Sequence, residues 1–234
     1  MENNKKPVFL AAKHLKPAIL DSLHAQGIQT FFLEPAPLIS TELKYHPDIL
    51  LCSCGDGTFV TSKSVYEKNS VLFDSLGMNV IVSRSELCDI YPQDVRFNAF
   101  FAGDTLFCSK HTAREIRDRA PSAVMFRQGY VKCSVAVIDS ETYITADRGI
   151  FEVLSSLKRN VLLIPEGDIG LSGFSCGFIG GAGGMITPDT FALFGDAKTL
   201  SGYELIKDFL TCRGIRILSL CEGPVYDYGG LIEI

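Results

Sequence analysis

Residues 46–62 read HPDILLCSCGDGTFVTS, and the same pattern returns without gaps at residues 130–146 as YVKCSVAVIDSETYITA. Thr58-Phe-Val-Thr61 in the first copy aligns with Thr142-Tyr-Ile-Thr145 in the second. Both copies contain two short runs of β-branched and aromatic residues joined by small or polar ones, which is typical of a β-hairpin. The chain therefore contains an internal repeat that begins with a hairpin.

The spacing of the threonine-led runs gives the number of repeats. Runs similar to that at Thr58 begin at Thr105, Thr142 and Thr190, so successive threonines lie 47, 37 and 48 residues apart. One more step of about 50 residues towards the N-terminus reaches the run from Val8. The 234 residues therefore accommodate five units of about 47 residues each.

Each unit has the same predicted order of elements. In the second unit, residues 49–54 and 58–62 form two strands around the turn Gly55-Asp56-Gly57, residues 62–76 form a helix, and residues 79–84 form a third strand. The other helices are predicted near residues 18–26, 111–119, 149–157 and 202–212. The other third strands are predicted at residues 29–33, 123–127, 161–165 and 215–220. The chain is thus predicted to be an α/β protein of five ββαβ units.

The two ends of the chain complete each other in this scheme. The first unit has one strand, residues 6–12, before its helix, and the chain ends in an additional strand, residues 230–234. Pairing of these two strands would complete the first unit and leave no free strand edge where the ends meet. We therefore predict a single closed domain over residues 1–234. One α/β sheet with helices on both faces is the competing fold, but it would not produce a hairpin in every unit.

Composition and charge exclude several classes of partner. The net charge is −5, with no block of lysine or arginine that could bind a row of phosphates, so we expect no nucleic-acid partner. The apolar run after Pro7 is too short for a signal peptide, and no run approaches the roughly 20 apolar residues that cross a bilayer. A soluble, cytoplasmic protein is expected. The eight cysteines lack metal-ligand spacing, so most are expected to be reduced core thiols, without metal or cofactor. The oligomeric state stays open.

Five ββαβ units closed by the C-terminal strand resemble the pentein fold of the guanidine-modifying enzymes. These are dimethylarginine dimethylaminohydrolase, arginine deiminase, agmatine deiminase and the amidinotransferases. The segments HPDILLC, YVKCSVAVI, ITADRGI, GFIGGAGG and DYGGLIEI are also similar to an uncharacterised bacterial family within that superfamily. The architecture also resembles that of the ribosomal anti-association factor, which is not an enzyme. The fold alone therefore does not decide the function.

The resemblance implies that the usual catalytic pair is missing. The enzymes use a cysteine on the C-terminal strand, a histidine that opens the fourth unit, and carboxylates that hold the guanidinium. The histidine pattern falls on Tyr130-Val-Lys132, and the glycine-rich pattern before the cysteine falls on Tyr228-Gly-Gly-Leu231 and ends near Glu233. Neither residue is present at its place, so the standard deiminase or hydrolase chemistry is not expected.

A site would form where the starts of the first strands converge on the ring axis. The candidate catalytic residues there are His46, Asp48, Tyr130 and Cys133, and the candidate ligand-binding residues are Asn98, Lys132, Gly180, Gly181, Asp227 and Gly229. His46-Pro-Asp48 joins an imidazole and a carboxylate that could bind a cation or relay a proton. The alternative is that His46 caps a loop and Asp48 is a solvated turn residue.

Three further features each have two interpretations. Lys132 would lower the pKa of the Cys133 thiol and make it a nucleophile, but Cys133 aligns with the apolar Ile49, which favours a core thiol. The glycine run at residues 177–184 is either a backbone nest for a carboxylate or a place of tight packing. Cys52 and Cys54 could bind a soft metal, although their apolar neighbours favour the core. Asp147 is expected to cap the helix that starts near Gly149.

Two classes of function remain. One is binding of, or action on, a small guanidino or amino-acid-like molecule in a central pocket; an enzyme of this kind would be a hydrolase or transferase acting on a C–N bond. The other is a non-catalytic pentein that binds a ligand or a protein. A concave pocket lined by acids with shifted pKa values would favour binding of, or action on, a small molecule. A ring axis filled by side chains, together with a flat apolar outer face, would favour the non-catalytic pentein.

Overall fold

The computed structural model describes residues 6–234, and these form five three-stranded sheets of the same internal topology. In each sheet the first two strands are antiparallel, and the third lies parallel to the second after a helical crossover. The repeat predicted from the threonine runs therefore corresponds to five ββαβ units. Residues 1–5, which the predicted single domain included, lie outside the described part of the chain.

The strands and helices of the units have the following bounds. The strands, sheet by sheet, are β15 (Ile232–Glu233), β1 (Val8–Ala11) and β2 (Gln29–Phe32); β3 (Leu51–Ser53), β4 (Thr58–Thr61) and β5 (Asn79–Val82); β6 (Phe100–Ala102), β7 (Thr105–Ser109) and β8 (Ser122–Phe126); β9 (Val135–Val137), β10 (Thr142–Thr145) and β11 (Asn160–Leu163); β12 (Gly183–Thr187), β13 (Thr190–Leu193) and β14 (Arg216–Ser219). The crossover helices are α1 (Pro17–Ala25), α3 (Lys63–Ser75), α4 (Arg114–Arg117), α6 (Arg148–Ser156) and α7 (Tyr203–Thr211). The shorter turns are η1 (Glu42–Tyr45), α2 (Pro47–Leu50), α5 (Val131–Ser134) and η2 (Ala197–Thr199).

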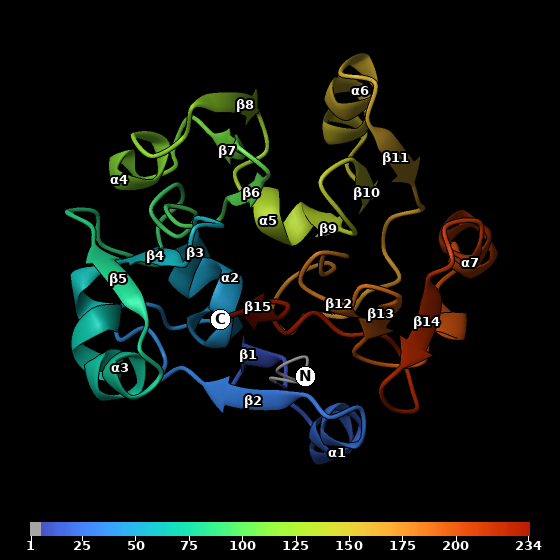
Figure 1. Cartoon of the computed structure of the whole chain (residues 1–234), viewed down its shortest axis with the longest axis horizontal. Coiled ribbons are helices and arrows are strands. Elements are labelled where there is room, and N and C mark those ends of the chain that lie inside the picture. Colours follow the sequence, from blue (N-terminus) through green and yellow to red (C-terminus); the bar gives the residue numbers. More distant parts are fainter. Residues whose placement is uncertain (1–5) are drawn as a thin grey trace, which may run out of the picture.

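Figure 1 shows the five sheets following one another around the middle of the molecule, with the crossover helices at the periphery and α2 and α5 near the middle. Among the helices of residues 6–234, none has the length and apolarity needed to cross a membrane. The arrangement puts the segments before the first strands at the centre.

Four of the five crossover helices begin and end within one residue of their predicted positions. The predicted cap of α6 is confirmed, since Asp147 Oδ1 accepts a hydrogen bond from the Ile150 amide at 2.9 Å. The third-unit helix was predicted too long, at residues 111–119. The hydroxyls of Ser109 and Thr112 bond backbone amides in the preceding turn, which gives the chain a non-helical alternative there.

The first strands of the second and fourth units start later than predicted, because a single helical turn precedes each of them. Pro47 stands at the first position of α2, where a missing amide costs nothing. Thr61 Oγ1 then donates to the last carbonyl of α2, that of Leu50, at 2.6 Å. In the fourth unit Thr145 Oγ1 donates to the carbonyl of Ser134 at 2.8 Å. These repeated threonines therefore satisfy the carbonyls that end the two helical turns.

The two ends of the described chain pair as predicted. β15 is antiparallel to β1, with Phe9 opposite Glu233 and Leu10 opposite Ile232. The amide of Ile234 donates to the carbonyl of Val8 at 3.0 Å. The C-terminal strand thus supplies the missing first strand of the first unit.

Half of the cysteines lie in the core. Cys52, Cys54, Cys108 and Cys133 are buried, while Cys212 is exposed and the other three are half-buried. The prediction that most of the eight are core thiols is therefore correct for four of them. Cys52 and Cys54 pack in the largest apolar cluster, as expected from their apolar neighbours.

Candidate functional site

The five segments that precede the first strands meet at the centre, where they contribute polar side chains and backbone groups. Hydrogen bonds join each of these segments to its neighbours. The Asn98 side chain donates to the Asp48 carbonyl, and the Gly180 amide donates to the Cys133 carbonyl. The Gly230 amide donates to the Gly181 carbonyl, and the Asp48 amide donates to the Gly229 carbonyl. The Asn98 amide also bonds Cys133 and so connects the third and fourth units. The contacts therefore run through all five units and return to the first.

Asn98 holds the second and fourth units in register. Its amide nitrogen donates to the Asp48 carbonyl and to Cys133 Sγ, both at 2.9 Å. Its oxygen accepts from the amides of Lys132 at 2.8 Å and Cys133 at 3.2 Å. All four hydrogen-bonding positions of this fully buried amide are used within the protein. Asn98 therefore positions its neighbours, and its predicted contact with a ligand stays a prediction.

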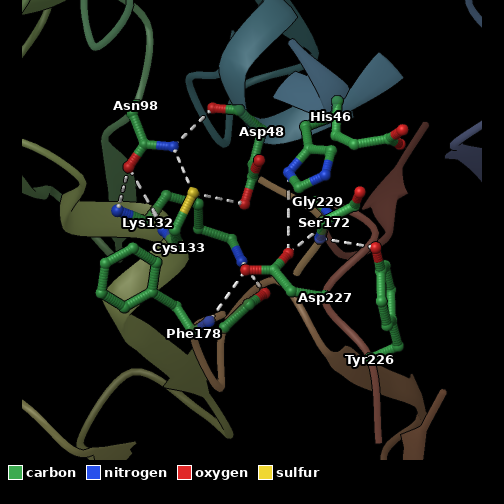
Figure 2. A network of polar contacts seen from close by, with 12 residues as sticks. His46, Asp48, Asn98, Lys132, Cys133, Ser172, Phe178, Tyr226, Asp227 and Gly229 are labelled. Carbon is green, nitrogen blue, oxygen red and sulfur yellow. Dashed lines mark hydrogen bonds and ion pairs between the residues drawn. The ribbon is translucent and has the colours of Figure 1, made fainter. Parts of the chain in front are cut away.

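Cys133 and Asp48 form a buried thiol–carboxyl pair. Cys133 Sγ donates to Asp48 Oδ2 at 3.1 Å, and Asp48 Oδ1 has no partner among the described residues (Figure 2). Burial raises the pKa of Asp48, although the Lys132 ammonium opposes this. Burial, followed by the charges of Asp48 and Asp227, raises the pKa of Cys133 well above its usual value. The pKa of this thiol is therefore shifted in the direction opposite to the activation by Lys132 in one of the two sequence interpretations, and the burial of Cys133 agrees with the other, a core thiol.

Asp227 and His46 face each other at the centre (Figure 2), with 3.6 Å between Asp227 Oδ1 and His46 Nδ1. Asp227 accepts hydrogen bonds from the amides of Phe178 at 2.8 Å and Gly229 at 2.9 Å. Burial, reinforced by the charge of Asp48, raises the pKa of Asp227 to about 7. Burial lowers the pKa of His46 to about 3. Burial thus favours the neutral form of the His46 imidazole and the protonated form of the Asp227 carboxyl.

Tyr130 stands at the position equivalent to His46, immediately before its helical turn. Its hydroxyl donates to Asp94 Oδ2, and its ring stacks on Phe178 with 5.9 Å between centroids. Burial and the bond to Asp94 raise the pKa of Tyr130. The sequence reasoning missed Asp94 and Phe178. Extending the internal alignment to the fifth unit would have found Phe178, because the strand registers align it with His46 and Tyr130.

These side chains surround a cavity of about 160 Å³, the inner cavity. It is lined by Leu43, His46, Tyr130, Cys133, Leu171, Phe174, Ser175, Cys176, Phe178 and Asp227. Four of the ten candidate residues therefore line one cavity, although up to 181 positions separate them in the sequence (46 to 227). Asp48 and Asn98 lie behind Cys133, where both bond its sulfur.

Lys132 and the three candidate glycines lie outside the lining of the inner cavity. Lys132 Nζ donates to the Gly180 carbonyl at 3.2 Å and borders two other cavities together with Glu233. A Cβ atom on Gly181 would lie 2.0 Å from Asp227 Oδ1, and one on Gly229 would lie 2.5 Å from the His46 Cα. The amides of Gly180 and Gly181 donate to backbone carbonyls. The close contacts of Gly180 and Gly181 are those of tight packing, and the Phe178 amide of the same run bonds a carboxylate of the protein itself, that of Asp227.

Residues 10–232 match DUF6873, described as a family of unknown function. The chain belongs to this family. No curated protein sequence matches the DUF6873 chain.

Several solved structures have the fold of this DUF6873 chain. The inosamine-phosphate amidinotransferase of Streptomyces griseus is 14% identical, with a TM-score of 0.53 over 87% of this chain and 72% of that one. Dimethylarginine dimethylaminohydrolase of Pseudomonas aeruginosa, as a cysteine-to-serine mutant complexed with citrulline, is 11% identical, with a TM-score of 0.52 over 91% of both chains. An amidinotransferase of saxitoxin biosynthesis from Microseira wollei is 9% identical, with a TM-score of 0.51 over 86% of this chain and 72% of that one. The resemblance to the pentein superfamily is thereby confirmed at the level of the fold.

Proposed function

We propose that this protein binds a small guanidino-type cation in the inner cavity, without the cysteine–histidine pair of the pentein enzymes. The observation that carries the proposal is Asp227, a buried carboxyl in the cavity wall opposite an imidazole that has no hydrogen-bond partner among the described residues. A cation at Asp227 would stabilise its ionised form, which burial alone disfavours.

The shape and chemistry of the wall support a planar cation. Tyr130 and Phe178 stack at 27° between their ring planes and present aromatic surface to the cavity. Aromatic faces attract cations, and a guanidinium can also stack on them. Of the three similar structures described above, two are amidinotransferases and the third is a dimethylarginine dimethylaminohydrolase complexed with citrulline. Their shared fold supports a guanidino ligand here by analogy.

We further propose that residues 6–234 are one domain, a closed propeller of five ββαβ blades. The five separate sheets support this, as does the set of central contacts that passes through all five units and returns to the first. In such a ring the inner cavity lies where the blades meet, and each blade contributes to its surroundings.

Catalysis on a C–N bond of a guanidino compound is the second candidate function. The hydrogen bond from Cys133 to Asp48 favours it, because a carboxylate beside a thiol can accept its proton. The raised pKa of Cys133 opposes it. We therefore place binding first and turnover second.

Titration calorimetry with arginine, agmatine and alkylguanidines tests the binding proposal, with citrulline, which has a neutral ureido group in place of the guanidinium of arginine, as the comparison. We expect guanidino compounds to bind at least tenfold more tightly than citrulline, since the ureido group offers no positive charge to Asp227. Asp227→Asn should abolish this preference, and Asp21→Asn, an exposed carboxylate on α1, should not change it.

Asparagine at position 227 can accept only one of the two backbone hydrogen bonds, so this variant will also be less stable. Leu171→Phe provides a second variant that fills the inner cavity and leaves every charge in place. It should weaken guanidinium binding while the protein stays folded by circular dichroism. Equal affinity of the wild type for citrulline and for the guanidino compounds would refute the proposal.

A further inference from the structure

The polar groups of the inner cavity have almost no contact with solvent. The side chains of His46 and Asp227 are each 1% exposed, and Cys133 is 2% exposed. A ligand from solution can therefore reach these groups only after part of the cavity wall has moved. Among the residues that line the inner cavity, only Phe174 and Ser175 are exposed. Both belong to one segment, residues 171–176, which we call the strap.

The strap is fixed at its two ends and exposed between them. The amides of Gly170 and Gly177, which flank it, donate to backbone carbonyls at 3.0 and 2.8 Å. Leu171 is buried in the largest apolar cluster, whereas residues 172–175 are all exposed. Few buried contacts hold such a segment, so it can move while the fold around it stays intact.

Within residues 6–234, one hydrogen bond connects the strap to another segment. The amide of Ser172 donates to Tyr226 Oη at 2.7 Å (Figure 2). Tyr226 is half-buried and lies against Gly170, where an added Cβ atom would be 2.8 Å from the tyrosine ring. The ring is thus held against the base of the strap, and its hydroxyl is in place to keep the strap closed.

The closed strap also depends on a glycine conformation. Gly173 has a φ of +81°, in the left-handed region that glycine adopts at little cost and other residues adopt with strain. An added Cβ atom at Gly173 would have no atom within 4 Å, so a side chain would fit there. Alanine at this position would therefore strain the closed backbone without a steric clash.

We propose that the strap is a lid, held closed by the Tyr226 hydroxyl, which opens to admit a ligand to the inner cavity. Opening breaks the bond from Ser172 to Tyr226 and takes Phe174 out of the cavity wall, while Gly170 and Gly177 keep their bonds. A local opening of this size exposes little surface, so it occurs far more often than global unfolding. The inference goes beyond the proposed function, because it does not depend on which molecule enters.

Alkylation of Cys133 by iodoacetamide measures the opening without any ligand. Cys133 lies in the wall of the inner cavity, and mass spectrometry of the folded full chain follows its labelling. All proteins compared carry Cys176→Ser, because Cys176 lines the same cavity and its alkylation would obstruct the entry. When the lid closes faster than the reagent reacts, the labelling rate is proportional to the open fraction.

Two variants weaken the closed strap in independent ways. Tyr226→Phe removes the hydroxyl and keeps the ring, and we expect it to raise the labelling rate of Cys133 roughly fivefold, as the loss of one hydrogen bond implies. Gly173→Ala strains the closed backbone and should raise the rate by roughly the same factor. Tyr66→Phe, at a half-buried tyrosine of α3 in the second unit, is the matched control and should leave the rate unchanged.

Two other thiols distinguish lid opening from a general loss of stability. Cys52 and Cys108 are buried in the largest apolar cluster and do not line the inner cavity, so their labelling rates should not change in either variant. The lid is refuted if Cys52 and Cys108 accelerate as much as Cys133, or if the Cys133 rate is the same in all proteins. It is also refuted if Cys133 stays unlabelled in the folded variants. Because no ligand takes part, the result is independent of whether guanidino compounds bind.

Discussion

Burial dominates the ionisation of the central side chains. Asp227, Asp48 and Cys133 all have raised pKa values with desolvation as the largest cause, and His46 has a lowered one for the same reason. Lys132 is adjacent to Cys133 in the sequence, but its ammonium bonds the Gly180 carbonyl. The pKa of the thiol is raised and not lowered because the thiol is buried and because its neighbours in three dimensions include the Asp48 and Asp227 carboxyls.

Turnover of simple guanidino compounds should be absent at this site. Incubation with arginine, agmatine or methylated arginines should give no ureido product above the buffer rate. The raised pKa of Cys133 favours a protonated thiol, and the hydroxyl of Tyr130, at the position of the enzymes' histidine, donates a hydrogen bond to Asp94. A colorimetric assay for citrulline-type products measures this. Turnover that survives purification to homogeneity and disappears in Cys133→Ser would instead establish Cys133 as a nucleophile.

The lowered pKa of His46 should appear in the pH dependence of stability. The unfolded imidazole binds a proton below about pH 6.5, whereas the folded one stays neutral down to about pH 3. His46 therefore destabilises the fold at low pH, and this cost disappears as the pH rises to about 6.5.

Urea unfolding of wild type and His46→Gln, compared at several pH values, isolates this effect. The wild type should gain stability relative to the variant by up to about 1.4 kcal/mol per pH unit between pH 4 and 6.5, and nothing more above that. A constant difference across this range would mean that His46 is protonated in the folded protein.

At the scale of elements, the sequence predicted the strands and helices that are long enough to show a period of apolar residues. The hairpins, the crossover helices and the third strands were predicted because each has its own apolar pattern. The single turns α2 and α5 were not, since four residues are too few to show a helical period. Their sequence signature is the threonine at the end of the following strand, whose hydroxyl reaches back to the last helical carbonyl.

The glycines of residues 177–184 differ in how much room each has for a side chain. A Cβ on Gly181 would overlap the Asp227 carboxyl, whereas a Cβ on Gly184 would meet its nearest atom, on Leu231, at 3.9 Å. We expect Gly181→Ala to destabilise the protein by roughly 3 kcal/mol and Gly184→Ala to change it by less than about 0.5 kcal/mol. Chemical denaturation of the two variants measures the difference. Equal stability would mean that Asp227 can move away at little cost.

At the scale of the whole molecule, convergence of the central residues could be predicted but the cavities could not. The repeat places the backbone of His46, Tyr130 and Asp227 near one axis, independently of the conformations of their side chains. The volume and shape of the inner cavity also depend on Leu171 and Phe174, which belong to irregular segments without a repeat, so no sequence pattern predicts them.

Removal of residues 230–234 should destabilise the whole protein. The deletion removes β15 with the buried Leu231 and Ile232, each worth roughly 1.5–3 kcal/mol, and leaves β1 with an unpaired edge. We expect the melting temperature to fall by roughly 10 °C or more. Glu233→Gln, which keeps the backbone pairing, should leave it unchanged. A truncated protein that melts within about 2 °C of the wild type would contradict the closing role of β15.

The pairing of β1 with β15 also constrains how the protein is made. Four of the sheets are built from strands that follow one another in the chain, so each can form soon after it leaves the ribosome. The sheet that contains β1 cannot, because its first strand, residues 232–233, is synthesised more than 200 residues after residues 8–11. Until residues 232–233 have been synthesised, the edge of β1 remains open to pairing with other nascent chains. The first unit can therefore close only after the other four units have been made, and of the second strands in the five sheets β1 waits longest for its antiparallel partner.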